Sequence, residues 1–205
     1  MKKILFTFFA CLAISFAKAD SPLTSTPFGE MYDDQEIVKF ALESNGEINT
    51  RIIEYLGQEE NPIWLKLAVI NALGWQFEGK DNHKEFLNYL TKTKKLKNIK
   101  TILKKGSAHD IICLAYLKAM DNYFDVKEAS KWSKIAQKKE PYSYSVHLVA
   151  ALIQAQEAFD TDWCKVYQLT DAVRQNQSLE IDMRDQAYTM IYRYMDLYKD
   201  SCTEK

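Results

Sequence analysis

The sequence is poor in glycine and histidine and carries almost no net charge. Its 205 residues include 6 glycines and 3 histidines. No phosphate-binding or dinucleotide-binding glycine loop occurs, and neither H-E-x-x-H nor G-x-S-x-G is present. The 27 basic side chains nearly balance the 28 acidic ones, so the charge gives no indication of a nucleic-acid partner. These absences predict no cofactor and identify no catalytic residue.

Patterns of metal ligands are also sparse. His109 and Cys113 lie four residues apart on an apolar stretch, but they offer two ligands where a zinc site needs three or four. His147 has no partner at ligand spacing. We therefore predict no metal site and expect Cys113 to be a buried thiol. Acidic residues are abundant, so a glycosidase with two catalytic carboxylates stays open, although no pair stands out.

The first 19 residues have the three parts of a secretory signal peptide. Lys2 and Lys3 form a basic start, residues 4–17 are an apolar run of 14 residues, and residues 17–19 read Ala-Lys-Ala. This run is shorter than the roughly 20 residues that span a bilayer, and no other run approaches that length, so we expect no transmembrane anchor after cleavage. The mature chain of 186 residues, with a net charge of −4, is then expected in the bacterial periplasm or outside the cell.

Apolar residues recur every three or four positions along most of the mature chain, which is typical of α-helices. Residues 20–33 contain two prolines and a glycine and predict an extended leader. The remainder, residues 34–205, predicts a single domain of about ten helices, near 34–44, 47–56, 62–78, 82–94, 96–105, 107–122, 126–139, 144–159, 161–175 and 179–199. Because the connections are short, consecutive helices should pack antiparallel, and we expect an all-α fold, an α-solenoid of helix hairpins.

One of these helices has the residue spacing of a known repeat. Ala129, Ser133 and Ala136 recur at spacings of four and three on one face, and Pro141 stops the helix. Small residues at this spacing, followed by proline, resemble the second helix of the tetratricopeptide repeat, although Ser133 is smaller than is usual at its position.

A second stretch is similar to the same repeat. Leu73, Gly74 and Phe77 resemble the L-G-x-x-Y core of the first helix, and counting onward places Phe86 and Leu90 at the small and large positions of the second. The resemblance covers about half of the mature chain. Another helical-repeat family with similar hairpins stays open.

The resemblance implies three repeats and a concave groove that binds peptides or proteins. The repeats would begin near residues 67, 110 and 144, and Trp163 departs from the small-residue rule in the third. Carried over to this chain, the groove residues are Asn71, Trp75, Glu78, Lys118, Asp121, Asn122, Leu148, Leu152 and Gln156. Trp75 is the best candidate for a binding anchor, because a desolvated aromatic side chain contributes much binding energy, and core packing is its alternative role.

Seven lysines between residues 92 and 105 are not interrupted by any acidic residue. Within the predicted helix of residues 96–105, the apolar residues share one side and three lysines share the other, namely Lys97, Lys100 and Lys104. A basic face of this kind attracts phospholipid headgroups, polyanionic glycans or acidic peptides. The alternative is an ordinary solvated surface.

Signal removal leaves three cysteines, Cys113, Cys164 and Cys202. An oxidising compartment favours one disulfide, which we place between Cys164 and Cys202 because Cys113 lies in the most apolar segment. An antiparallel pair of helices would bring both cysteines to the same end. Cys202 would then overshoot by roughly 16 Å at 1.5 Å per residue unless the chain folds back after Lys199.

The sequence thus predicts an exported helical-repeat protein that binds a protein or peptide, or serves as a scaffold, in the cell envelope. An exported enzyme of the same fold, acting on polysaccharide or peptide, is the alternative. Acidic residues converging in one cleft would favour the enzyme, and a dispersed stripe along a groove would favour binding.

Overall fold

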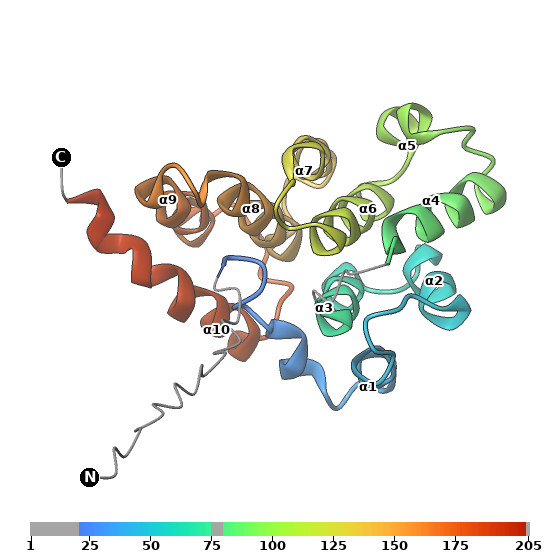
Figure 1. The fold of residues 1–205 in the computed structure, drawn as a ribbon, viewed down its shortest axis with the longest axis horizontal. Coiled ribbons are helices and arrows are strands. Elements are labelled where there is room, and N and C mark those ends of the chain that lie inside the picture. Colours follow the sequence, from blue (N-terminus) through green and yellow to red (C-terminus); the bar gives the residue numbers. More distant parts are fainter. Residues whose placement is uncertain (1–20, 75–79, 204–205) are drawn as a thin grey trace, which may run out of the picture.

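The computed structural model describes residues 21–74 and 80–203, and within them the fold is all-α. These residues form ten α-helices and two 3-10 helices (Figure 1). The α-helices are α1 (Glu36–Leu42), α2 (Thr50–Gly57), α3 (Ile63–Leu73), α4 (Asn82–Thr93), α5 (Ile99–Lys105), α6 (Ala108–Asp121), α7 (Lys127–Lys139), α8 (Tyr144–Ala158), α9 (Trp163–Gln175) and α10 (Asp185–Met195). The 3-10 helices are η1 (Phe28–Tyr32) and η2 (Asp196–Cys202). The predicted all-α class and the expected number of about ten helices are confirmed for these residues.

Side-chain caps explain where five of the helices begin. Asn49, Asn98, Ser107, Ser143 and Asp162 each precede a helix, and the side-chain oxygen of each accepts a hydrogen bond from the backbone N–H three residues later. Each of these bonds satisfies one of the four N–H groups that a helix start leaves unpaired. Local sequence therefore determines these helix starts.

The helices pack mainly against their neighbours along the chain, and α3, α6 and α8 also contact one another at the centre of the molecule (Figure 1). These three helices are buried along nearly their whole length, whereas α4, α7 and α9 bury one side. In α7 the small residues Ala129, Ser133 and Ala136 are fully buried. Their size lets α7 approach the helices beside it closely.

Residues 21–33 differ from the extended leader that the sequence predicts. A hydrogen-bonded turn precedes η1, and Leu23, Phe28 and Tyr32 are buried. The ring of Tyr32 stacks on Trp64 with the ring centroids 5.3 Å apart. Burial of these large apolar side chains outweighs the local preference of the prolines for an open, extended chain. The segment is therefore part of the helical domain.

Helix α3 ends earlier than the predicted boundary at residue 78. Its last residue is Leu73, and Gly74 follows with a φ of 75°. This left-handed backbone conformation costs glycine little and ends the helix. Three sequence predictions lie outside the described residues, namely the signal peptide of residues 1–19 and the roles of Trp75 and Glu78. Among the helices that are described, none has the length and apolar character needed to cross a bilayer.

The loop between α9 and α10 is held against the turn between α7 and α8. Glu180 forms an isolated β-bridge with Ser143. The Asp182 carboxylate accepts hydrogen bonds from the Ser143 hydroxyl at 2.6 Å and from the backbone N–H of Ser145 at 2.7 Å. Because the loop is fixed there, α10 begins at Asp185, later than predicted. Figure 1 shows that α10 and η2 cross α9 instead of lying antiparallel to it.

Cys164 and Cys202 form a disulfide, with their Cα atoms 4.6 Å apart. The overshoot expected for an antiparallel pair does not arise, because the crossing brings η2 onto the first turn of α9. The predicted bridge is therefore present, and Cys113 is the free, buried cysteine. Burial raises the pKa of the Cys113 thiol to about 12, so this thiol stays protonated and unreactive at neutral pH.

Candidate functional site

Asn71, a predicted groove residue, holds the N-terminal segment of its own chain. Its Oδ1 accepts a hydrogen bond from the backbone N–H of Gly29 at 2.6 Å. Its Nδ2 donates to the Thr26 carbonyl at 3.1 Å and to the Tyr116 hydroxyl at 2.8 Å. The residue is 7% exposed. One side-chain amide thus binds peptide backbone through both its oxygen and its nitrogen.

Three further groove residues lie in α8, on the same side of the molecule. Leu148 and Leu152 are fully buried. Gln156 accepts a hydrogen bond through Oε1 from the backbone N–H of Leu23 at 3.3 Å. Residues 21–32 therefore contact the predicted groove at Asn71 in α3 and at Gln156 in α8. Binding of a partner by these residues stays a prediction, and it would require the segment to move.

The remaining groove residues gather at the end of α6. Lys118 forms an ion pair with Glu128 at 3.1 Å. Asn122 is exposed, and its Oδ1 accepts a hydrogen bond from the backbone N–H of Phe124 at 3.2 Å. Lys118 thus contacts α7, and Asn122 contacts the loop that joins α6 to α7. Asp121, in contrast, belongs to a separate cluster.

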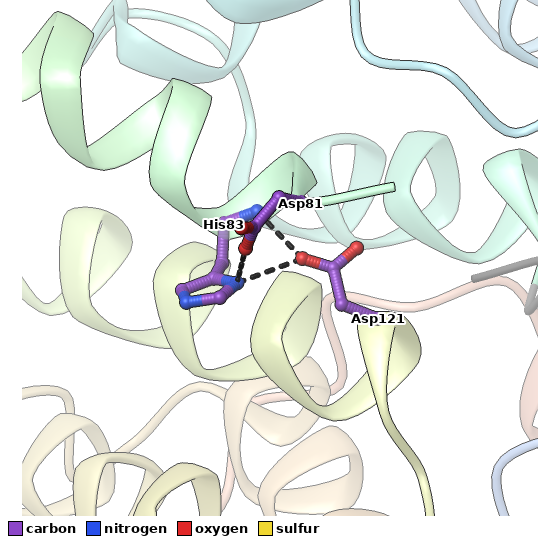
Figure 2. A group of neighbouring side chains, drawn as sticks. All are labelled: Asp81, His83 and Asp121. Atoms are coloured by element: carbon purple, nitrogen blue, oxygen red, sulfur yellow. Dashed lines mark hydrogen bonds and ion pairs between the residues drawn. The ribbon is translucent and has the colours of Figure 1, made fainter. Parts of the chain in front are cut away.

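Asp81, His83 and Asp121 form this cluster, where the start of α4 meets the end of α6 (Figure 2). His83 Nδ1 lies 2.8 Å from Asp121 Oδ2 and 3.2 Å from Asp81 Oδ1. Asp121 Oδ2 also accepts a hydrogen bond from the backbone N–H of His83 at 2.8 Å. The side chains of His83 and Asp121 are 14% and 7% exposed, whereas that of Asp81 is 45% exposed. One imidazole nitrogen and two carboxylate oxygens therefore converge where solvent has access from the Asp81 side.

No motif in the sequence indicates this cluster. Asp81 and His83 are two residues apart, a spacing that places two ligands at one helix start but that also occurs by chance. Asp121 was expected on a binding groove. It reaches the other two residues only because α4 packs against α6, a tertiary contact with no local signal.

A second group of charged side chains joins the loop after α2 to α4 and α6. Lys94 pairs with Asp110 at 2.6 Å and also with Glu59. The Ser107 hydroxyl donates to Glu59 at 3.0 Å. Lys66 is fully buried nearby, and its burial lowers the pKa of its ammonium group. Lys94 thus forms internal ion pairs and is not part of the solvated lysine run. These contacts hold the loop after α2, the end of α4 and the start of α6 together.

An open groove of about 500 Å³ lies between α7, α8 and α9. Side-chain amides line it, including Gln168 and Asn176, and Gln154 Nε2 donates to Gln137 Oε1 at 3.0 Å. His147 lies on the same groove, and its Nε2 is buried without a hydrogen-bond partner among the described residues. Burial lowers the pKa of His147, so the imidazole is neutral at neutral pH. The backbone of Glu140 and Gln137 opposes this lowering, and because Nε2 is enclosed by protein, the polar groups that the groove presents are mainly its side-chain amides.

Lys97, Lys100 and Lys104 are exposed, as the sequence pattern indicates. Lys97 precedes α5, and the other two lie on it. Ile102 is buried on the opposite side of the helix. None of the three lysines forms an ion pair with another residue of the described part of the chain. Their interaction with an anionic partner stays a prediction.

We expect the triple substitution Lys97→Gln, Lys100→Gln and Lys104→Gln to weaken adsorption to vesicles that contain phosphatidylglycerol. Each lysine near an anionic surface contributes roughly 1 kcal/mol at low salt, so the loss should exceed tenfold. Vesicle sedimentation at several salt concentrations measures it, and the difference from the wild type should shrink as salt screens the charges. A control with the same charge change replaces three exposed lysines elsewhere, Lys39, Lys127 and Lys199. If both variants lose the same amount of vesicle adsorption, the lysine face is an ordinary solvated surface.

Comparison of the chain with protein-family models, with curated proteins and with solved structures gives no match. The resemblance to the tetratricopeptide repeat thus rests on the motif residues alone and stays a prediction. The function must be argued from the chemistry of the surfaces described above.

Proposed function

We propose that this chain is an exported helical-repeat protein that binds a peptide or protein segment and acts as a binding or scaffold module in the bacterial cell envelope. Its helices would form an α-solenoid of hairpins similar to tetratricopeptide repeats. The observation that carries the proposal is the open, amide-lined groove between α7, α8 and α9.

The chemistry of this groove suits an extended peptide backbone. Every peptide unit offers one N–H donor and one carbonyl acceptor, and side-chain amides such as Gln154 and Gln168 offer the same pair of groups. The charges of Asp162 and Lys165 on the groove balance, so the lining favours neither anions nor cations.

The molecule already contains one example of such recognition. Asn71 binds the backbone of Gly29 and Thr26, and Gln156 binds the backbone of Leu23. In both cases a side-chain amide on an α-helix holds the backbone of the segment that leads into η1. This internal complex supports the proposal that the amides of the α7–α9 groove hold a segment of another chain.

Export is supported by the disulfide as well as by the predicted signal peptide. Disulfides persist in oxidising compartments such as the periplasm and are rare in a reducing cytosol. The bridge between Cys164 and Cys202 therefore fits a protein that folds after translocation.

Selection of random displayed peptides on the mature protein tests the proposal. We expect peptides to be enriched, and a synthetic copy of an enriched peptide should bind the double variant Gln154→Ala, Gln168→Ala at least tenfold more weakly than the wild type. Loss of two hydrogen bonds of about 1 kcal/mol each accounts for this size. Fluorescence anisotropy with a labelled peptide measures it.

A matched control replaces Gln58 and Gln186, two exposed glutamines outside the groove. It should bind the peptide as the wild type does. Failure to enrich any peptide, or an equal loss of affinity in both double variants, would contradict binding at this groove.

A further inference from the structure

We propose that Asp81, His83 and Asp121 bind a zinc ion at the junction of α4 and α6. One imidazole nitrogen and two carboxylate oxygens form a mixed set of donors that suits zinc, which binds histidine nitrogen at about 2.0 Å and carboxylate oxygen at about 2.0 to 2.2 Å. Calcium and magnesium prefer oxygen donors alone. This site lies apart from the α7–α9 groove, so it does not depend on peptide binding.

The donor atoms are already spaced as metal ligands are. Two ligands about 2.1 Å from a metal lie roughly 3.0 Å apart at a right angle and roughly 3.4 Å apart at the tetrahedral angle. His83 Nδ1 lies 2.8 Å from Asp121 Oδ2 and 3.2 Å from Asp81 Oδ1, and the three donor atoms lie within 4.8 Å of one another. Figure 2 shows the other ring nitrogen turned away from both carboxylates, so the ring proton can reside there while Nδ1 binds the metal.

Asp121 gives a second, independent indication of a cation. Its side chain is 7% exposed, Oδ2 accepts the backbone N–H of His83 and lies 2.8 Å from His83 Nδ1, and no described residue donates a hydrogen bond to Oδ1. Asp121 is also the last residue of α6, where the negative end of the helix dipole disfavours an anion. The exposed Lys84 pairs with Asp81 and not with Asp121. A buried carboxylate in this position is stabilised by a divalent cation.

Two packed helices hold the cluster, and one side of it is open. Asp81 is the residue before α4, His83 lies in the first turn of α4, and Asp121 ends the helix that packs against it. Structural zinc sites close with four protein ligands, whereas sites with three protein ligands keep a position for water. The exposed side of Asp81 provides that position, so the bound ion should exchange with solvent and carry a water ligand.

The same contacts also have a role without metal, because Asp121 accepts the first-turn N–H of His83 and so helps to cap α4. A hydrogen-bonded clasp of this kind stabilises the fold but binds no ion. The two possibilities differ in what the exposed Asp81 does. It is a ligand in the zinc site and contributes little to the clasp.

Isothermal titration of zinc chloride into the mature protein, prepared without a histidine tag and stripped with EDTA, tests the site. We expect one saturable zinc ion per chain. Asp81→Asn should lower the zinc affinity at least tenfold, since loss of even an outer-shell partner costs 10 to 100-fold. Asp81 is 45% exposed, so this variant should fold as the wild type does, which circular dichroism verifies.

Two matched controls, His109→Gln and His147→Gln, remove the other histidines and should bind zinc as the wild type does. In the wild type, cobalt added in place of zinc should give a visible absorption band that Asp81→Asn weakens. Absence of saturable zinc binding, or unchanged affinity in Asp81→Asn, would overturn the proposal. If, in addition, His83→Gln lowers the melting temperature by the same amount with and without zinc, the cluster is only a hydrogen-bonded clasp.

Discussion

Replacement of Cys164 and Cys202 by serine is expected to lower the free energy of unfolding by about 2 to 4 kcal/mol. The bridge joins cysteines 38 positions apart, so its loss gives the unfolded chain many more conformations. Without the bridge, η2 stays on α9 only through packing and through the ion pair of Arg174 with Asp196. In that packing the Tyr198 ring meets Phe159 and Trp163 edge to face, at centroid distances of 5.8 and 6.3 Å.

Urea denaturation with and without a reductant measures this effect. Reductant should lower the stability of the wild type to that of the double variant and should leave the double variant unchanged. A Cys113→Ala control removes the free thiol and should keep the response to reductant. Denatured but unreduced protein from an oxidising compartment should show one free thiol per mature chain. Three free thiols there would show that the bridge does not form.

The positions of most helices follow from local signals. A cap such as Ser107 or Asn98, followed by apolar residues at helical spacing, identifies a helix start without knowledge of the fold. Helix ends are harder to predict. The apolar pattern continues past α3 in the sequence, but the helix stops at Gly74 because the backbone there takes a left-handed conformation that no periodicity reveals.

Features that depend on distant contacts could not be predicted. The prolines of residues 21–33 indicate an extended leader, yet Phe28 and Tyr32 are buried by side chains from other helices. In the same way, α10 crosses α9 because the loop before it is held at Ser143, the residue that precedes α8. In both cases a tertiary contact overrides the structure that the local sequence pattern predicts.

In the candidate site, too, local features could be predicted from the sequence and features that depend on tertiary contacts could not. Family resemblance placed Asn71 on a peptide-binding surface, and it does bind peptide backbone, but the peptide belongs to the same chain. The spacing of Asp81 and His83 is visible in the sequence, whereas the third member, Asp121, lies 38 positions from His83. Only the packing of α4 on α6 brings the three together. The groove at His147 likewise requires the arrangement of three helices.

The substitution Gly29→Ala is expected to lower the free energy of unfolding by about 2 to 6 kcal/mol. A Cβ atom at this position would lie 2.7 Å from the Ala68 carbonyl oxygen and 2.9 Å from the Ala72 nitrogen. Both are backbone atoms of α3, which cannot move aside cheaply. Overpacking of this kind costs about 1 to 3 kcal/mol, and displacement of the segment also breaks the bond to Asn71, which costs about 1 to 3 kcal/mol more.

Urea denaturation again measures the free energy of unfolding. The matched control is Glu30→Ala at an exposed neighbouring position, which should change this free energy by no more than about 0.5 kcal/mol. Asn71→Ala should destabilise too. The double variant Gly29→Ala, Asn71→Ala should lose less than the sum of the two, because both act on the same docking contact. Wild-type stability of Gly29→Ala would show that the segment does not pack against α3 in solution.

The way in which Gly29→Ala unfolds also decides between two binding surfaces. If the segment detaches while the helices stay folded, a protease should cut within residues 21–32 long before the rest of the chain, because local opening exposes only that region. The side chains of Asn71 and Gln156 would then be free for a partner, as the family resemblance implies. If cleavage requires global unfolding, the segment is an integral part of the core, and the α7–α9 groove is the surface left for a peptide partner.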